Sequence, residues 1–185
     1  MEGLLLRPRA GVTTAPPWPR AEPVTTQRLV LEPLRPDHAR ELAPVLADPA
    51  LHTFTGGQPA DGAELRARFA RQAAGRSPDG AQGWLNWVAR DRATDAPVGI
   101  VQATVTDDEG VRTAALAWVV ATSRQGEGLA TEAAGAAMDW MRDHGVIRFA
   151  AHIHPDHAAS AAVARHLGLA ATDERRDGEV RWVEW

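Results

Sequence analysis

The sequence predicts an α/β protein of 185 residues built on one mixed sheet, mostly antiparallel, with a central parallel pair flanked by helices. An apolar run typical of a buried strand, 114–121, leads through a glycine-bearing turn into a segment with helical spacing, 129–144. A second apolar strand, 146–153, follows that helix, and a right-handed crossover places such strands parallel. The other strands are joined by short turns, which favour antiparallel pairing.

The first predicted elements lie before residue 75. The first strand is expected over 25–33, because apolar residues alternate from Leu29 and Pro33 ends the pattern. A short helix is expected over 36–46, with a proline that makes its middle irregular. Asp61 followed by Glu64 has the spacing of a capping box, which predicts the start of a second helix.

Three antiparallel strands are predicted next, over 84–90, 98–105 and 111–121, because turn-forming residues separate them. The helix over 129–144 is supported by apolar residues at every third or fourth position. The strand over 146–153 completes the crossover.

The C-terminal part is predicted as a helix followed by a hairpin. Pro155 ends the preceding strand, the helix begins at 156 or 157, and Gly168 closes it in the position after the C-cap. The hairpin over 170–185 turns on Asp177-Gly178, a strong signal for a two-residue turn.

Composition narrows the class of protein. Hydrophobic residues make up 44%, charged residues 24%, the net charge is -4 and there is no cysteine. These values indicate a globular protein without disulfides or thiol catalysis, and they argue against nucleic acid or a membrane as partner. With no apolar run of membrane-spanning length and no signal peptide, a cytoplasmic location is expected. We expect an extended or disordered N-terminal arm over 1–22, or else a docked extension, followed by a single domain over 23–185.

The stretch 123–133 is the strongest functional signal. A strand, a turn with Gly126 and Gly128, and a helix follow one another, so unpaired N–H groups gather where the helix dipole favours an anion. A P-loop would require Lys-Ser or Lys-Thr after the last glycine, and this chain lacks that pair. A Rossmann turn would require a Gly or Ala at position 131, which is Thr131 here. A glycine-rich turn without a ligand also stays open.

Gln125-x-x-Gly128-x-Ala130 resembles the acyl-coenzyme A signature of the GNAT acetyltransferases, Gln/Arg-x-x-Gly-x-Gly/Ala. The Ala-Thr-Glu-Ala that follows, and the Thr-x-Arg-Leu opening before residue 30, are similar to the branch that contains ribosomal-protein N-terminal (alanine) acetyltransferases. The resemblance covers roughly residues 25–185. It implies the GNAT fold and acetyl-CoA as acetyl donor, with no metal.

The resemblance also implies site residues. Main-chain groups of Val119 and Val120 match the positions that bind pantetheine, and His157 stands where the family has an Asn that organises them. Ser160 matches a position near the sulfur, where its hydroxyl would stabilise the leaving thiolate. A purely structural role for the valines and a helix-capping role for Ser160 stay open. The positions that match the pyrophosphate turn are Arg124, Gln125, Gly126, Gly128, Ala130 and Thr131.

The expected chemistry is poor in acids and bases. Related enzymes often use a Glu on the central strand as base and a Tyr as acid, but 113–118 has no carboxylate and the chain has no Tyr. An α-amine, with a pKa of roughly 7.7–8.0, needs less help than a lysine amine near 10.4. We therefore expect water-relayed deprotonation. Gln102 is a further candidate for lining the acceptor pocket. The tryptophans at 84, 87 and 118 are candidates as well, although packing in the core accounts for at least two of the three. A metal cluster at 152–157 is a weaker alternative.

The function expected from these observations is transfer of the acetyl group of acetyl-CoA to a primary amine, directly in a ternary complex. The acceptor is a protein N-terminus or a small molecule, and the net charge slightly favours a cationic one. Exposed sheet edges allow a homodimer. The alternatives are a non-catalytic acyl-CoA-binding sensor or scaffold and a nucleotide-binding protein.

Overall fold

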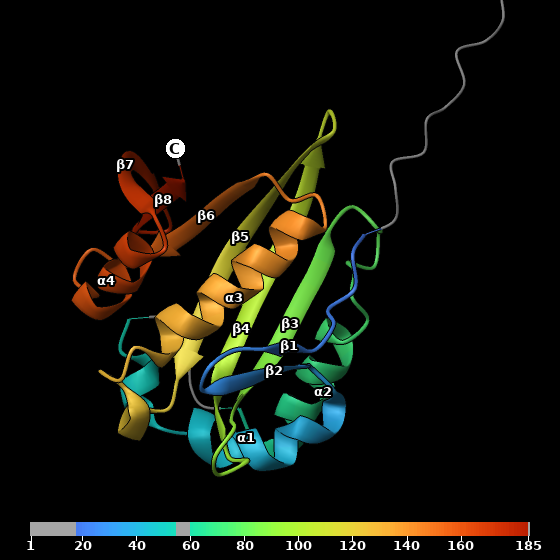
Figure 1. Ribbon diagram of the computed structural model, residues 1–185, viewed down its shortest axis with the longest axis vertical. Coiled ribbons are helices and arrows are strands. Elements are labelled where there is room, and N and C mark those ends of the chain that lie inside the picture. Colours follow the sequence, from blue (N-terminus) through green and yellow to red (C-terminus); the bar gives the residue numbers. More distant parts are fainter. Residues whose placement is uncertain (1–17, 55–59, 185) are drawn as a thin grey trace, which may run out of the picture.

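One eight-stranded sheet organises the chain in the computed structural model, which describes residues 18–54 and 60–184. The strand order is β1-β2-β3-β4-β5-β6-β8-β7 (Figure 1). Every neighbouring pair is antiparallel except β5 and β6, which confirms the predicted mixed sheet with a central parallel pair. The strands are β1 (Val24–Thr25), β2 (Leu29–Pro33), β3 (Gly83–Asp91), β4 (Pro97–Asp108), β5 (Val111–Val120), β6 (Arg148–Ile153), β7 (Leu169–Arg176) and β8 (Glu179–Glu184).

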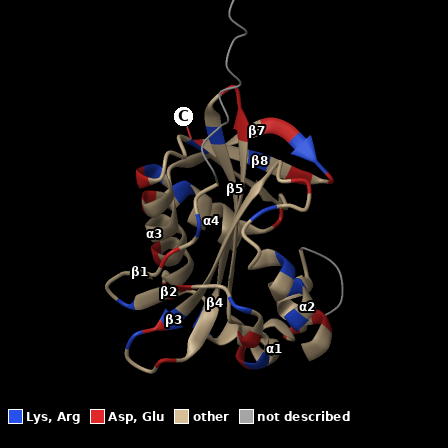
Figure 2. Ribbon diagram, turned by 90° about the vertical axis from the view of Figure 1, so that its right-hand side faces the viewer, with Lys and Arg blue, Asp and Glu red and all other residues tan. Residues whose placement is uncertain are grey.

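Helices cover both faces of the sheet. Figure 2 shows α3 on one side and α1 with α2 on the other. The α-helices are α1 (Ala39–Leu46), α2 (Gly62–Gln72), α3 (Leu129–Asp143) and α4 (Ala158–His166). Short 3-10 turns are η1 (Pro36–His38), η2 (Pro49–His52) and η3 (Thr122–Arg124).

The two faces of the sheet carry separate apolar clusters. On the α3 face, Trp87, Val101 and Leu116 pack with Leu129 and Met138 of the helix. On the other face, a row of apolar residues in register lies under α1 and α2. This row is Val88 of β3, Ile100 of β4 and Val119 of β5. The helical layer covers this row and leaves part of the same face open, which creates the cavity described below.

Several local predictions are confirmed. Asp61 caps α2, and both arms of its capping box with Glu64 are present. Gly168 adopts φ 83° after α4, and the β7–β8 turn has Asp177 at φ 53° and Gly178 at φ 86°, the left-handed pair of a type I′ turn. Trp185, the last residue of the expected hairpin, lies outside the described residues.

The first strand differs from its prediction. The segment expected as one strand over 25–33 is divided into β1 and β2, which pair antiparallel with each other. Thr26 closes the tight turn between them, because its hydroxyl accepts from the N–H of Leu29 and its own N–H donates to the Leu29 carbonyl. A two-residue strand carries no periodicity, which is why the sequence pattern does not reveal β1.

Residues 18–22 lie against the sheet. The Trp18 indole N–H donates to the Gly80 carbonyl, and its ring packs on Gly83 and under the Arg112 guanidinium. The Trp87 indole donates to the Glu22 carbonyl. Residues 1–17 of the expected arm lie outside the described residues.

The two outer strands are poor templates for further pairing. β7 forms one edge and carries four consecutive exposed charged residues, 173–176. At the other edge, β1 has two residues. None of the helices in the described part of the chain has the length and apolarity that crossing a membrane requires.

Candidate active site

The parallel strands β5 and β6 separate before either strand ends. Their register runs from Thr113 opposite Arg148 to Leu116 opposite Ala151. β5 then continues to Val120 paired with β4 alone, while the end of β6 pairs with β8. Within the described residues, the β6-facing edge of 117–120 therefore has no strand partner, and its main-chain groups can bind an extended ligand.

The chain turns from this opening into α3 through a loop built for an anion. Gly126 and Gly128 have φ of 78° and 77°, a region that glycine enters without steric cost, and Gly128 is the N-cap of α3. The first intrahelical bond runs from Glu132 N–H to the Gly128 carbonyl. In the described structure, the N–H groups of 126–131 have no acceptor, so six donors gather at the positive end of the helix dipole. We call 126–131 the cradle.

Arg124 holds the cradle from the side facing the β3–β4 turn. Its guanidinium bonds both carboxylate oxygens of Glu127, at 2.9 and 3.0 Å, and Asp91 at 2.9 Å. These hydrogen bonds, first that to Glu127 and then that to Asp91, raise the pKa of Arg124. The arginine is thus engaged by two carboxylates and fixes the loop that precedes α3.

A second clamp holds the cradle from the N-terminal strands. Glu132, in the first turn of α3, accepts from the Thr26 hydroxyl at 2.6 Å, from the Arg28 N–H at 2.8 Å and from Arg28 Nε at 2.6 Å. Arg28 also donates through Nη1 to the Glu127 carbonyl at 2.8 Å. We call this group of Thr26, Arg28 and Glu132 the strap. It joins the β1–β2 turn to the cradle across more than a hundred residues of sequence.

The start of α4 lies at the end of β6, across the opening from β5. His157 is its N-cap, and its ring stacks on Phe54 with centroids 4.4 Å apart. Burial, and then the neighbouring His154, lower the pKa of His157, so its imidazole is neutral at pH 7 and can donate one hydrogen bond. Ser160 is half-buried in the first turn of α4, and its hydroxyl makes no capping bond with any described residue. That leaves the hydroxyl free for a ligand.

A cavity of about 430 Å³ opens beside the splayed strands, on the face covered by α1 and α2. Its floor consists of two cross-strand rows in register. These rows are Asn86–Gln102–Ala117 and Trp84–Thr104–Ala115. Ala117 is the first residue of β5 beyond the last β5–β6 pair, so the inner end of the cavity meets the opening between the strands.

The wall of the cavity comes from α2 and is polar. Arg68, Arg71 and Gln72 lie on one face of the helix at i, i+3 and i+4. Gln102 Nε2 donates to Asn86 Oδ1 at 3.0 Å, and Asn86 Nδ2 reaches the Gln72 carbonyl at 3.4 Å. This polar chain fixes the amide groups at the floor.

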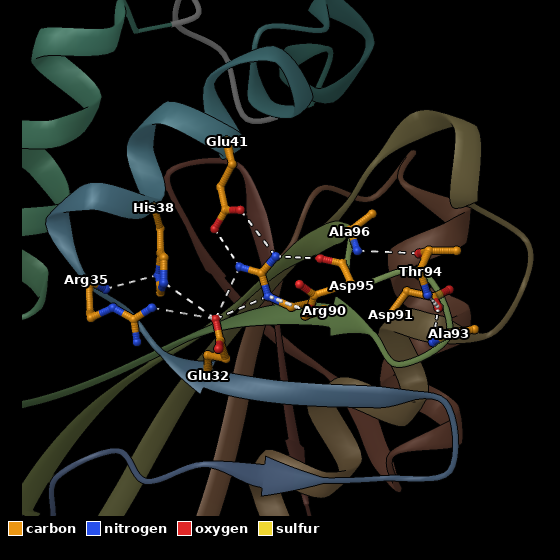
Figure 3. Close-up of polar contacts among 10 residues, drawn as sticks. All are labelled: Glu32, Arg35, His38, Glu41, Arg90, Asp91, Ala93, Thr94, Asp95 and Ala96. Carbon is orange, nitrogen blue, oxygen red and sulfur yellow. Dashed lines mark hydrogen bonds and ion pairs between the residues drawn. The ribbon is translucent and has the colours of Figure 1, made fainter.

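A half-buried charge cluster attaches α1 to the sheet (Figure 3). The Arg90 guanidinium is 12% exposed and bonds Glu41 of α1 at 2.6 Å and Glu32 of β2 at 3.2 Å. His38 packs beside it, with Nδ1 accepting from the Arg35 N–H. Burial, and then the charge of Arg35, lower the pKa of His38. The cluster holds the helical layer that forms the wall of the cavity.

The structure brings the expected site residues together around the opening: the ends of β5 and β6, the cradle and the start of α4. Gln102 and Trp84 line the cavity, whereas Trp87 is fully buried and Trp118 packs against the α3 core. No group of His, Asp and Glu in residues 18–54 and 60–184 is arranged to hold a metal ion. Arg68, Arg71 and Glu132 were not among the residues expected in the site.

A family model described as an acetyltransferase (GNAT) domain matches residues 28–170, well over half of the chain. The chain belongs to the GNAT acetyltransferase family. It is thereby an acetyl-CoA-dependent acetyltransferase by class, as the sequence resemblance implied. A search of curated proteins finds no match.

Solved GNAT structures share the fold. A GNAT-family acetyltransferase from Bordetella pertussis superposes with a TM-score of 0.64 at 24% identity, covering 88% of this chain and 97% of that one. The ribosomal L7/L12 α-N-protein acetyltransferase RimL, solved with coenzyme A, gives 0.70 at 17% identity, covering 88% and 97%. The microcin C7 self-immunity acetyltransferase MccE, solved with acetyl-CoA and AMP, gives 0.66 at 17% identity, covering 86% and 93%.

The residues present fit coenzyme A on their own geometry. Free N–H groups in the cradle suit a pyrophosphate, because they are donors already oriented by the helix. The unpaired edge of 117–120 suits the amide groups of pantetheine. Ala117, the first residue of β5 beyond the last β5–β6 pair, also lines the cavity, so the opening and the cavity adjoin.

Proposed function

We propose that this GNAT protein transfers the acetyl group of acetyl-CoA to a primary amine, directly and within a ternary complex. The observation that carries the proposal is the separation of β5 from β6 immediately before a cradle of free N–H groups. A donor bound along that line and an amine in the cavity would meet at Ala117 without a covalent enzyme intermediate.

The coenzyme contacts in this proposal come largely from the main chain. The N–H groups of 126–131, with Gly126, Gly128, Ala130 and Thr131 among them, bind the pyrophosphate. The main chain of Val120 lies on the β6-facing edge and binds the pantetheine, whereas the Val119 carbonyl points at Gly99 of β4, so the expected role of Val119 does not fit this edge. Gln125 Nε2 lies 3.2 Å from the Val120 carbonyl and orients this segment. Arg124 acts by holding the loop, since Glu127 and Asp91 already engage its guanidinium. His157 supplies one hydrogen bond to the pantetheine arm.

The reaction joins the amine nitrogen to the thioester carbonyl carbon and breaks the carbon–sulfur bond. The amine proton leaves through water, because no carboxylate or imidazole belongs to the described residues that line the cavity. The Ser160 hydroxyl donates to the departing sulfur. Such a site favours a weakly basic amine, and an α-amine at pKa roughly 7.7–8.0 is partly neutral at pH 7. Catalysis then depends mainly on positioning the two substrates.

Two measurements test this function. Calorimetry with coenzyme A and acetyl-CoA should show saturable binding, with ATP and NAD as controls that do not bind. Free-thiol release from acetyl-CoA should then depend on an added amine, and the assay has no protein background because the chain has no cysteine. Failure of both coenzyme forms to bind would remove the proposal. Binding without acetylation of any amine would instead identify a non-catalytic acyl-CoA-binding module.

A further inference from the structure

The cavity next to the splayed strands carries two positive charges without counter-charges. Arg68 and Arg71 line it from α2, and neither guanidinium has a carboxylate at ion-pair distance within the described residues. Arg66, on the same helix, pairs with Asp37 at 3.0 Å. Basic segments run along α2 in Figure 2. The two cavity arginines thus differ from their neighbour in having no acidic partner.

The environment of the two arginines favours an anion. Both arginines are exposed to solvent where they line the cavity; partial desolvation, and then the positive charge of Arg71, lower the pKa of Arg68. One turn apart on the same face of α2, they can both donate hydrogen bonds to one oxyanion. The net charge of the whole chain is negative, but the charge at this cavity has the opposite sign.

The floor of the cavity supplies a group for the amine. Gln102 uses Nε2 to donate to Asn86, which leaves its Oε1 as an acceptor with no partner among the described residues. Gln102 is directly opposite Ala117 in the β4–β5 register, beside the opening where the acetyl group would arrive. The amine of an acceptor can therefore donate to Gln102 Oε1 at the inner end of the cavity. The anionic end of the same acceptor can bind Arg68 and Arg71 at the α2 wall.

The size of the cavity limits the acceptor. About 430 Å³ falls in the range of small-molecule sites, and Trp84 offers an apolar surface between the two polar ends. None of the described residues that line the cavity is a carboxylate or an imidazole, which favours an α-amine as acceptor. A short peptide with a free C-terminus has such an amine and an oxyanion a few ångströms away.

We propose that the acceptor is a small amine that also carries an oxyanion, with Arg68 and Arg71 binding the oxyanion and Gln102 orienting the amine. The proposal rests on the acetyltransferase function and names its substrate class. The oxyanion is a carboxylate or a phosphate, since a pair of guanidinium groups recognises both.

Matched acceptors test the charge requirement. Diglycine and its C-terminal amide share the same α-amine and differ in one carboxylate, and O-phosphoethanolamine and ethanolamine do the same for phosphate. Spermidine represents a cationic acceptor. The wild type should acetylate diglycine or O-phosphoethanolamine faster than the neutral partner, by roughly tenfold or more in kcat/KM, which is the effect of a hydrogen bond to a charged group. Calorimetry on the coenzyme-saturated protein should show the same order of binding.

Three variants locate the effect. Arg71→Gln and Arg68→Gln should each lower kcat/KM for the anionic acceptor by roughly tenfold to a hundredfold and leave the neutral amide unchanged. Arg66→Gln, on the same helix but paired with Asp37, should change neither. Thermal melts confirm that all three fold, and coenzyme A affinity should be equal in all of them.

The outcomes separate the two proposals. Loss of coenzyme binding in the wild type contradicts the acetyltransferase function itself. Coenzyme binding together with equal or better acetylation of the neutral amides or spermidine overturns the oxyanion proposal and leaves the function in place. Coenzyme binding with neither binding nor acetylation of diglycine or O-phosphoethanolamine overturns it as well.

Discussion

The strap between Glu132 and the N-terminal strands gives a prediction about how the cradle is held. Glu132→Gln keeps the size of the side chain but removes its charge, and its amide nitrogen cannot accept from Arg28. The wild-type carboxylate accepts three hydrogen bonds at 2.6–2.8 Å and is 18% exposed, whereas Arg28 is 45% exposed. Solvent screening at Arg28 reduces the contribution of the Arg28–Glu132 ion pair to the free energy of unfolding. We expect a loss of about 1–2 kcal/mol in the free energy of unfolding, part of it from the Thr26 bond.

That loss corresponds to a fall of about 2–8 °C in Tm for a chain of this size. Because Glu132 lies in the first turn of α3 and Arg28 also binds the cradle carbonyl of Glu127, the cradle should move and coenzyme A affinity should fall severalfold. Differential scanning calorimetry and titration calorimetry measure the two effects. Glu174→Gln is the matched control, since its 2.8 Å ion pair with Arg181 lies on the β7–β8 hairpin.

The pH dependence provides a second check on the same variant. Burial raises the pKa of Glu132, but the hydrogen bonds from Thr26 and Arg28 outweigh burial and hold the pKa below its ordinary value. The stabilisation is therefore present above the unfolded pKa, roughly 4.3, and is lost as the pH falls through the folded value. The Tm difference between wild type and variant should narrow below about pH 4. Unchanged Tm and unchanged coenzyme A affinity in Glu132→Gln would refute the reasoning.

Three other predictions concern the site and its support. In Gly99→Ala the new Cβ would lie 2.1 Å from the Val119 carbonyl oxygen, so β5 must shift. We expect the free energy of unfolding to fall by about 1–3 kcal/mol and coenzyme A to bind more weakly. Gly62→Ala is the control, because its new Cβ meets open space, and it should show neither effect in the same titrations. Ser160→Ala should lower kcat at saturating acetyl-CoA with KM for the amine little changed; an unaltered kcat would remove Ser160 from the mechanism. Because the pKa of buried His38 is lowered, its contribution to stability is present above about pH 6.5 and declines as the pH falls below that value. In His38→Gln the fall in Tm between pH 7 and pH 5 should therefore be smaller than in the wild type. An equally steep fall in Tm would contradict this reasoning.

Most of the fold could be predicted from the sequence because its signals are local. The capping box at Asp61, the turn at Asp177-Gly178 and the apolar period of α3 each depend on residues a few positions apart. The glycine turn before α3 predicted the cradle for the same reason. The family signature then supplied the identity of the ligand, which no local pattern contains.

The parts that could not be predicted depend on residues far apart. Arg28 meets Glu132 across 104 positions, and no spacing rule connects them. The capping box that predicted α2 says nothing about Arg68 and Arg71. What marks these two is that neither has an acidic partner within the described residues, and only the folded structure shows this. Whole-chain charge averages over surfaces that do not face the cavity, so it does not report the charge of the residues that line it.

The strands at the two margins of the sheet bear on how copies of this GNAT protein could meet. The run of four charged residues at 173–176 would be desolvated if a second copy extended the sheet from β7, and the two residues of β1 offer too few main-chain bonds to repay such a contact. Edge-to-edge association of many copies into a continuous sheet is disfavoured for the same reason. A homodimer of this protein would therefore use helical surfaces rather than the edges of its sheet.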